Sequence, residues 1–280
     1  MIQSKNPQNL LQFKAADFSD INLILKTKPR SLTFGRYLYA FAYQQQHYWL
    51  KTQALNVNAT IEVGFLNEWA FYQQWIDTPK QPEFLLPFQM LSEFNIEDLE
   101  QQDATALILP HGEALWIEHA ERSVHAIKQR IGQLLDAVDQ LHQSGWIHGD
   151  LKREHVVAYQ QQLCLIDFEQ VQKIDSPTNL QNLTATPRYM APELFHGEAK
   201  TVQTDIYALG IILYEWLSGQ RLRAKNYQEW AYLHCQCLSI ELPQQFSIFE
   251  KLLSGMLAKQ KAQRFTDIYS IKQCLITEIA

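Results

Sequence analysis

The stretch HGDLKREH, His148 to His155, lies between an amphipathic helical pattern and a short apolar run. It places a carboxylate, Asp150, two residues before a lysine, Lys152, and a histidine stands at each end. A carboxylate can accept a proton, and a nearby ammonium group can offset negative charge that develops during a reaction. The stretch therefore predicts a reaction centre in the middle of the chain.

A second set of charged residues completes this pattern. The segment LIDFE places Asp167 at the end of an apolar strand, and Lys51 lies in the strand YWLK. Glu68, on the helix that follows, can pair with Lys51, although Glu62 competes with it if the register is shifted. Phosphoryl transfer needs a divalent metal across the phosphates, a base that orients the hydroxyl, and a cation near the transferred group. These residue types in this order predict phosphoryl transfer.

Composition limits the other possibilities. The chain has 280 residues, of which 46% are hydrophobic, which is enough for two lobes with their own cores. A net charge of −6 disfavours nucleic acid as a partner, because phosphate backbones need clustered cations. The four cysteines lack metal-site spacing. We find no signal peptide, and the longest uncharged apolar segment, Ile206 to Tyr214, is too short for a membrane span. We expect a cytoplasmic protein without membrane insertion.

The first hundred residues predict strands and one helix. Aromatic-rich runs on either side of QQQH indicate a hairpin, although the turn lacks the Asn-Gly pair typical of tight two-residue loops. Apolar residues at helical spacing follow, and then a segment broken by two prolines. The expected elements are strands over 21–25, 36–43, 48–55 and 105–110, and a helix over 66–76.

The rest of the chain predicts mainly helices. A long amphipathic helix ends near Gly145, and a helix that is apolar nearly all round is closed by Gly219. Two short strands around a polar turn lie between them. The expected helices cover 124–141, 205–218, 247–257 and 266–276. A strand-rich first part and a larger helical second part predict an α+β fold.

These motifs together resemble the eukaryotic-type serine/threonine protein kinase domain. HGDLKREH resembles the catalytic loop HRDLKxxN, and the DFE of 167–169 resembles DFG. TPRYMAPE resembles the end of the activation segment, and TDIYALG resembles the helix whose aspartate, here Asp205, anchors the catalytic loop. Arg264 resembles the late arginine that pairs with the glutamate of APE, here Glu193. The resemblance runs from about residue 20 to the C-terminus.

The resemblance implies a two-lobed protein kinase-like fold in a single domain over residues 1–280. A small antiparallel-sheet N-lobe with one helix would cover about 1–109. The hinge and a larger, mainly helical C-lobe would cover about 110–280. Backbone groups of the hinge would meet the adenine of ATP, and the hinge residues would be Leu109, Pro110, His111 and Gly112.

The resemblance also assigns roles to the charged residues. Lys51 would hold the α- and β-phosphates of ATP, and Glu68 would position that lysine. Asp150 would orient the substrate hydroxyl, and Lys152 would offset charge on the γ-phosphate. Asp167 would bind Mg²⁺ or Mn²⁺. His155 stands where the family has a second metal-binding residue, an asparagine.

The glycine-rich phosphate loop of the family is degenerate here. The segment KTKPRSLTFG holds a single glycine, Gly35, where several glycines normally let backbone amides approach phosphate. Our hypothesis is that Lys26, Lys28 and Arg30 replace part of this amide cradle with side-chain charge. The alternative is that they are solvated loop cations beside a weak nucleotide site.

Three further substitutions affect the chemistry. Glu169 replaces the glycine of DFG, and His155 replaces the metal-binding asparagine. Imidazole suits softer divalent ions than Mg²⁺, so His155 together with Glu169 predicts a preference for Mn²⁺. Alternatively, His155 only forms hydrogen bonds with Asp150 or nearby backbone. Gly149 replaces the arginine that, in the family, binds a phosphorylated residue of the activation segment.

The loss of that arginine bears on regulation. Because Gly149 has no side chain, we predict that activity does not require phosphorylation of Ser176, Thr178 or Thr184. Thr186 is expected to have a structural or substrate-facing role.

The expected function is transfer of the γ-phosphoryl group of ATP to a serine or threonine hydroxyl of a protein. Lys152 favours serine and threonine over tyrosine, as the resemblance implies. The first alternative is a pseudokinase that binds nucleotide or protein, suggested by the missing glycines and by His155. The second is a small-molecule kinase of the aminoglycoside type, which also carries an HGD loop. The APE and TDIYALG motifs and Arg264 count against that second alternative.

Overall fold

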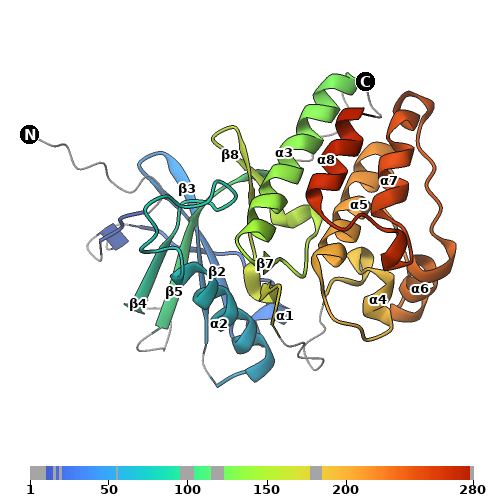
Figure 1. Ribbon diagram of the computed structural model, residues 1–280. Coiled ribbons are helices and arrows are strands. Elements are labelled where there is room, and N and C mark those ends of the chain that lie inside the picture. Colours follow the sequence, from blue (N-terminus) through green and yellow to red (C-terminus); the bar gives the residue numbers. More distant parts are fainter. Residues whose placement is uncertain are drawn as a thin grey trace, which may run out of the picture. The chain divides into compact units, whose positions relative to one another are not determined.

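The computed structural model describes residues 11–14, 17–18, 21–54, 56–94, 104–114, 123–176 and 185–277. The chain forms two compact units (Figure 1). The first consists of 1–113 with 159–169, and the second of 114–158 with 170–280. The first unit is therefore discontinuous in sequence, because 159–169 returns to it. The prediction of one domain over the whole chain stays a prediction.

The first unit is built on a five-stranded antiparallel sheet in the order β1-β2-β3-β5-β4. The long helix α2 (Ala59–Gln73) and the single turn α1 (Pro29–Leu32) accompany it. The strands are β1 (Ile24–Leu25), β2 (Arg36–Tyr43), β3 (Gln46–Gln53), β4 (Gln89–Phe94) and β5 (Ala104–Pro110).

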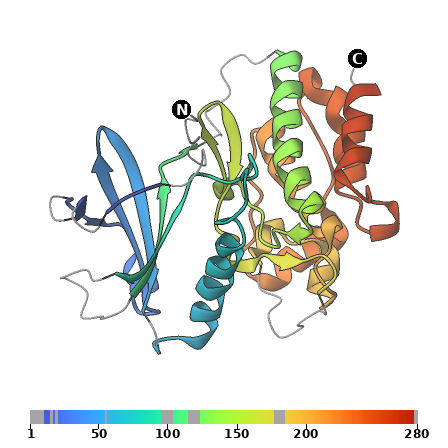
Figure 2. The same ribbon diagram turned by 60° about the vertical axis from the view of Figure 1, so that its left-hand side comes forward.

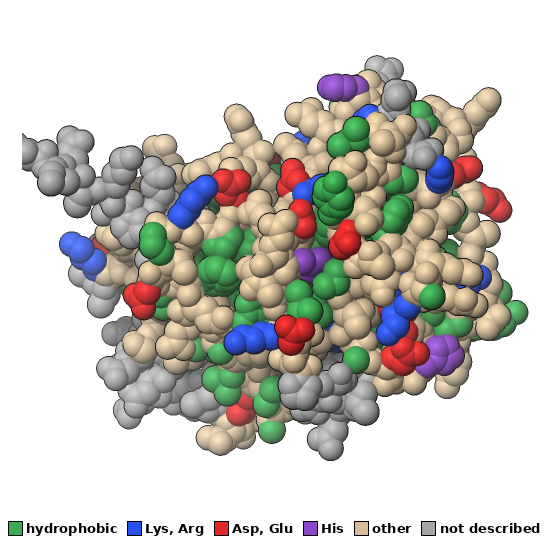
Figure 3. Space-filling model, viewed as in Figure 1, with side chains coloured by type: hydrophobic (Ala, Val, Ile, Leu, Met, Phe, Trp, Pro, Cys, Tyr) green, Lys and Arg blue, Asp and Glu red, His purple; other side chains and the backbone are tan. Residues whose placement is uncertain are grey.

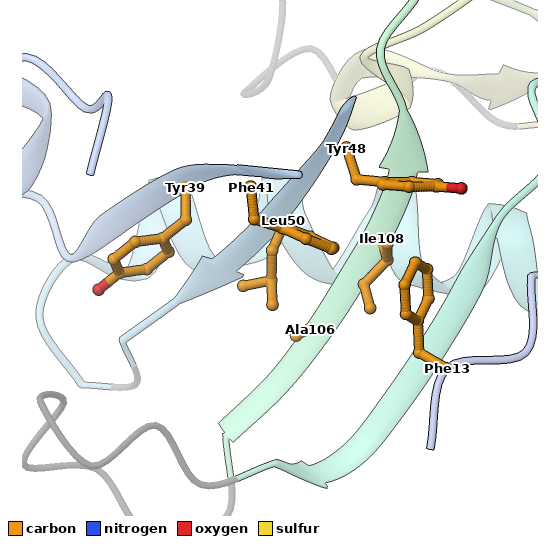
Figure 4. Packing of buried hydrophobic residues seen from close by; sticks show 7 residues of the cluster. All are labelled: Phe13, Tyr39, Phe41, Tyr48, Leu50, Ala106 and Ile108. Atoms are coloured by element: carbon orange, nitrogen blue, oxygen red, sulfur yellow. The ribbon is translucent and has the colours of Figure 1, made fainter. Parts of the chain in front are cut away.

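The core of this sheet follows from strand periodicity. Alternate residues of β2, β3 and β5 lie on one face, and pairs such as Tyr39–Leu50 and Phe41–Tyr48 stand opposite each other in the ladder. Figure 4 shows these side chains together with Phe13, which comes from a segment before the sheet. Phe13 packs edge-on against Tyr48 at 4.9 Å between ring centroids. The other face of the sheet is thereby left for polar side chains such as Lys51.

The β2–β3 hairpin uses an unexpected turn. Its two turn residues, Gln44 and Gln45, both have positive φ, at 48° and 65°. Tyr43 and Gln46 pair directly, so the loop has only two residues. Such a turn needs two left-handed residues, and Asn-Gly supplies them at least cost. The hairpin forms here without that pair because both strands are held in register by the aromatic core.

Helix α2 begins earlier than the expected helix. Asn58 caps it by accepting a hydrogen bond from Ile61 N at 3.1 Å. Glu62 Oε1 accepts from the amides of Val57 and Asn58 at 2.8 and 3.2 Å. The cap and these bonds extend the helix to Ala59, seven residues before the position that apolar spacing indicated. Strand β4 is also absent from the sequence prediction.

The second unit is mainly helical, as expected. Its helices are α3 (Val124–Gln143), α4 (Pro192–Phe195), α5 (Val202–Ser218), α6 (Tyr227–Tyr232), α7 (Glu250–Met256) and α8 (Ile268–Thr277). Helices α3 and α8 lie side by side in Figures 1 and 2. The short strands β7 (Trp146–Ile147) and β10 (Gln172–Lys173) form an antiparallel pair. Of the remaining strands, β9 (Gln162–Leu165) belongs to the first unit, and β6 (Glu113–Ala114) and β8 (Val156–Tyr159) lie where the chain passes from one unit to the other.

Helix α5 is the centre of the second unit. Every residue from Thr204 to Leu217 is buried, as its apolar sequence predicts. The helix ends at Gly219, which has a φ of 70° and closes it in the left-handed conformation. A five-residue π-helical turn, Leu233–Cys237, follows α6 and was not predicted.

Two features of the whole chain bear on its surroundings. Within the described ranges, no helix is both long and apolar enough to cross a membrane. On the face shown in Figure 3, basic and acidic side chains are interspersed, and the described side chains form no continuous basic band there.

Candidate active site

Lys51 occupies the face of the sheet opposite the aromatic core. Because Leu50 faces that core, the pleat turns Lys51 to the other side, toward α2. Its Nζ lies 2.6 Å from Glu68 Oε2, 3.2 Å from Asp167 Oδ1 and 2.6 Å from Glu169 Oε1. The structure thus brings together Lys51 and two of the residues predicted to act with it.

Glu68 is the polar member of the buried face of α2. It is 1% exposed and lies among apolar residues at helical spacing, including Phe65 and Phe71. Its second oxygen, Oε1, accepts a hydrogen bond from Phe168 N at 3.0 Å. Glu62 is instead bonded to the start of the helix. The competing register is therefore excluded, and Glu68 is the partner of Lys51.

The DFE segment is packed against α2. Phe168 is fully buried, and its ring lies 4.3 Å from that of Phe71 between centroids. Asp167 has a positive φ of 65°, an uncommon conformation for a residue other than glycine. Glu169 forms ion pairs with Lys51 and with Arg36 of β2. A Cβ on Gly64 would lie 3.2 Å from Glu169 Oε2, so glycine at this position leaves room for the glutamate.

Charge in this group is unevenly balanced. Burial by itself would lower the pKa of Lys51, but the carboxylates of Asp167, Glu68 and Glu169 outweigh it and raise that pKa. Burial raises the pKa of Glu68, with Lys51 opposing it. Three carboxylates face two cations, Lys51 and Arg36, so a negative charge is left over when all are ionised.

The same carboxylates fit a divalent cation. Oxygens of Glu68, Asp167 and Glu169 all lie within 4.8 Å of one another. Carboxylate oxygen is the ligand type that Mg²⁺ and Mn²⁺ prefer. The donor set therefore suits a divalent cation, which would compete for these carboxylates with Lys51, already paired with all three.

The second unit holds the catalytic-loop residues. Asp150 Oδ1 accepts a hydrogen bond from Thr186 N at 2.7 Å, and Lys152 Nζ lies 3.5 Å from Asp150 Oδ2. The backbone of Thr186 thus ties the end of the activation segment to the aspartate. Because the backbone amide makes this contact, the structural or substrate-facing role of the Thr186 side chain stays a prediction.

Asp205 anchors the catalytic loop from helix α5. Its two carboxylate oxygens accept hydrogen bonds from His148 N at 2.8 Å and Gly149 N at 2.9 Å, and His142 Nε2 lies 2.9 Å away. Burial would raise the pKa of Asp205, but the hydrogen bond from His142 and the other donors lower it. The anchor expected from TDIYALG is confirmed.

His155 forms the hydrogen bond that its alternative role predicts. Its Nδ1 lies 2.9 Å from the backbone oxygen of Asp150, and its ring stacks on that of His148 at 5.6 Å. Since a carbonyl oxygen only accepts, Nδ1 carries the proton in this bond. Metal binding by His155 would therefore have to use Nε2. That role stays a prediction.

The hinge residues continue the sheet. Leu109 and Pro110 end β5, where they pair with Trp49 and Tyr48 of β3. The amide of His111 donates to His47 O at 2.8 Å, and Pro110 has no amide hydrogen. Fewer backbone donors remain for adenine than the sequence suggested. The adenine-binding role of Leu109 to Gly112 stays a prediction.

The degenerate phosphate loop has a structural reason for its one glycine. Gly35 has a φ of 74°, and a Cβ there would lie 2.9 Å from Ala54 Cβ. Its carbonyl accepts a hydrogen bond from Ala54 N at 2.6 Å. Packing against the end of β3 therefore requires this glycine. The phosphate-binding role proposed for Lys26, Lys28 and Arg30 stays a prediction.

Residues 99–278 match the model of the protein kinase domain family. This chain belongs to that family. It is 32% identical over 150 residues to a probable serine/threonine-protein kinase PknB of Lactococcus lactis, covering 49% of this chain and 23% of the relative. It is 31% identical over 150 residues to the serine/threonine-protein kinase TIO of Arabidopsis thaliana, covering 52% of this chain and 11% of the relative. The chain thus spans less than a quarter of these two relatives.

A solved structure supports the same fold. The kinase of the Cydia pomonella granulovirus superposes with a TM-score of 0.62 at 18% identity, covering 92% of this chain and 94% of the viral one. The predicted two-lobed kinase-like fold, with an antiparallel-sheet N-terminal part and a helical C-terminal part, is confirmed.

The kinase domain also contains the expected ion pair between Arg264 and Glu193 of the APE motif. Arg264 binds Glu193 through two bonds, Nη1 to Oε1 at 2.7 Å and Nη2 to Oε2 at 2.9 Å. Both side chains are buried, so the pair is fully desolvated and geometrically specific. It fixes the APE segment to the region between α7 and α8.

Three residues of the kinase site escaped the sequence prediction. Arg36 and Gly64 surround Glu169, and Lys200 lies against the catalytic loop. An arginine at a strand start, a glycine in a helix and a lysine in a loop each have ordinary structural explanations. No motif or spacing marks them, because their contacts come from segments distant in sequence.

Proposed function

We propose that this kinase domain transfers the γ-phosphoryl group of ATP to a serine or threonine hydroxyl of a protein. The observation that carries the proposal is the ion-paired group in which Lys51 meets both Glu68 and Asp167. A buried lysine held charged between carboxylates is arranged to bind negatively charged phosphate oxygens. The identity to serine/threonine-protein kinases supports the choice of substrate class.

The charged residues around Lys51 in the first unit each have a role in this proposal. Lys51 holds the α- and β-phosphates, and Glu68 fixes the direction of the ammonium group. Asp167 would hold the divalent cation, and Glu169 would supply a further oxygen. When bound, the cation would neutralise charge on the phosphates.

The catalytic loop of the second unit supplies the remaining roles. Asp150 orients the acceptor hydroxyl and accepts its proton as the oxygen attacks the γ-phosphorus, whose bond to the bridging oxygen breaks and releases ADP. Lys152 offsets the negative charge of the transferred group. The hydrogen bond from the backbone amide of Thr186 to Asp150 Oδ1 holds the carboxylate in a fixed direction, with Oδ2 toward Lys152.

The test is transfer of labelled phosphate from γ-labelled ATP to a generic protein substrate, with Mg²⁺ or Mn²⁺ present. Replacement of Lys51 by Met, of Asp150 by Asn, or of Asp167 by Ala should each lower the rate by about 10²-fold or more. Thermal melting should show that the variants remain folded. Turnover at the wild-type rate in any of the three would show that the site is wrongly assigned.

The pseudokinase alternative has one observation in its favour. Glu169 already occupies one side of Lys51, and Arg36 holds that glutamate in place. In a pseudokinase this contact would persist, so the wild type would transfer no more phosphate than the Asp150→Asn variant. In an active kinase the phosphates and the metal would compete with it, so the wild type would transfer more than that variant. Nucleotide binding, followed as a shift in melting temperature, should occur in both cases.

The proposal requires ATP, Mg²⁺ or Mn²⁺, and a protein substrate as partners. The buried Glu193–Arg264 pair favours a protein kinase over an enzyme of the aminoglycoside type, on the same grounds as the APE motif. A cytoplasmic location and the absence of nucleic acid among the partners stay predictions from the sequence.

A further inference from the structure

The space above Gly149 is filled by a lysine from another segment. Gly149 has a φ of 77°, and a Cβ on it would lie 2.5 Å from the carbonyl oxygen of Gln170. The same Cβ would lie 3.1 and 3.2 Å from Cδ and Nζ of Lys200. Position 149 therefore has no room for a side chain, because the Gln170 carbonyl lies too close, and Lys200 packs against the same space.

Lys200 connects the catalytic loop with the start of the activation segment. It lies just before Thr201, the N-cap of α5, and is 5% exposed. Its Nζ donates a hydrogen bond to Gln170 Oε1 at 3.2 Å. Its carbonyl oxygen accepts one from Gln172 Nε2, also at 3.2 Å. Lys200 thus contacts two residues that follow the DFE motif, Gln170 and Gln172.

The ammonium group of Lys200 is buried among groups of the reaction centre. The amide oxygen of Gln170 accepts its hydrogen bond, and the carboxylates of Asp150 on the catalytic loop and Asp205 on α5 act electrostatically on its charge. Burial lowers the pKa of Lys200 to about 8, although Asp150 and Asp205 act to raise it. A solvated lysine would avoid this burial, so the position of the charge calls for a functional explanation.

We propose that Lys200 is a positioning residue of this kinase, whose ammonium group fixes the start of the activation segment against the catalytic loop and acts electrostatically on Asp150. The part of this inference that concerns Asp150 rests on the proposed function. In this arrangement Lys200 supplies the cation that acts on Asp150. No phosphorylated residue is needed to hold this cation in place. Position 149 is glycine because its backbone is left-handed and the Gln170 carbonyl excludes a side chain, and Lys200 packs against this glycine.

The test compares wild type with Lys200→Met, which removes the charge and keeps the chain length, and with Lys200→Arg, which keeps the charge. Lys225→Met is the matched control, since Lys225 is an exposed lysine of the same unit. The first readout is amide hydrogen exchange of residues 170–174 in the full chain, which does not depend on activity. We expect Lys200→Met to exchange about tenfold faster there, and the control to match wild type.

The second readout is the initial rate of phosphoryl transfer between pH 6.5 and 9.5. Wild type should lose activity as the pH rises through about 8. Lys200→Met should be about tenfold to a hundredfold slower at neutral pH and lack that alkaline loss. Lys200→Arg should retain activity and stay flat over this range, because arginine remains charged.

Unchanged exchange of residues 170–174 in Lys200→Met would overturn the proposal, whatever the rates. If Lys200→Met does not fold, the rate–pH profile of Lys200→Arg tests the proposal. A loss of activity at alkaline pH in Lys200→Arg, like that of wild type, would overturn the proposal, and a flat profile would support it. If wild type shows no transfer above the Asp150→Asn variant, the proposed function fails. The exchange result then still decides whether Lys200 positions the segment.

Discussion

Gly149 illustrates how a single residue departs from the kinase pattern for a packing reason. A left-handed backbone and the nearby carbonyl of Gln170 together exclude a side chain there. The sequence marks this glycine only as a missing arginine. The structure adds this cause, and it also places Lys200, from the loop before α5, against the same space.

Replacement of Gly149 by alanine should destabilise the domain. A left-handed alanine and a Cβ 2.5 Å from a backbone oxygen should together lower the free energy of unfolding by about 2–4 kcal/mol. Gly132→Ala is the matched control, since a Cβ at that position in α3 meets nothing within 4 Å and alanine favours helix. Denaturant unfolding of both variants measures the difference. Equal stability of Gly149→Ala and wild type would contradict the packing argument.

His155 provides a second prediction at this scale. If Nε2 of His155 binds metal, the wild type should be more active with Mn²⁺ than with Mg²⁺, and His155→Asn should return preference to Mg²⁺. Rates measured with each metal test this. Identical metal preference in the two proteins would leave His155 only the hydrogen bond with the backbone of Asp150.

At the scale of elements, the activation segment is held at both ends without a modified residue. Near its start, Gln172 of β10 pairs with Ile147 of β7. Near its end, Thr186 N binds Asp150, and Glu193 binds Arg264. Of the three hydroxyl residues considered as activating sites, Ser176 is described, whereas Thr178 and Thr184 lie outside the described residues.

Simultaneous replacement of Ser176, Thr178 and Thr184 by alanine should therefore leave the initial rate within a few-fold of wild type. The physical reason is that Gly149 offers no charged side chain to a phosphate. In addition, the pairing of β10 with β7 fixes the segment near its start, and the hydrogen bond from Thr186 N to Asp150 fixes it near its end. Rates of phosphatase-treated wild type provide the control. A fall of more than about tenfold in the triple variant would reveal an activating phosphate and contradict the prediction.

At the scale of the whole molecule, buried ionisable groups set the pH range of stability. His234 of the π-helical turn is fully buried and lies 3.0 Å from the hydroxyl of Tyr207. Burial lowers its pKa from 6.5 to about 4. Between these values the unfolded chain binds more protons than the folded one, so stability is full above pH 6.5 and falls as the pH drops toward 4.

His234→Gln should remove most of this acid sensitivity. From the two pKa values, the wild type should lose about 3 kcal/mol of unfolding free energy between pH 6.5 and pH 4 through this residue. Glutamine carries no charge and still offers a partner to Tyr207. Urea unfolding at pH 7, 5.5 and 4 measures how the free energy of unfolding changes with pH in wild type and in His234→Gln. His125→Gln, at the exposed start of α3, is the control. Parallel slopes in wild type and His234→Gln would show that another group is responsible.

The family, the helical second unit and most strands of the first were predictable from local pattern. Strand β2 and helices α3 and α5 match their expected ranges closely, because one buried face imposes a period of two or 3.6 on the sequence itself. The Lys51–Glu68 pair and the Asp205 anchor followed from motif order. The start of α2 was missed because a cap, and not apolar spacing, sets it.

Other features arise only when distant segments pack together. The Gln44–Gln45 turn depends on strand register, and the ion pairs of Glu169 depend on Arg36 and the space at Gly64. Lys200 reads as a solvated loop lysine in the sequence, yet it is buried against Gly149. Periodic burial can be predicted from residues close together in the sequence. The groups that surround a charge depend on how distant segments pack, so the sequence pattern does not indicate them. The sequence alone therefore identifies the kinase, and the packed structure identifies the charges that surround its reactive groups.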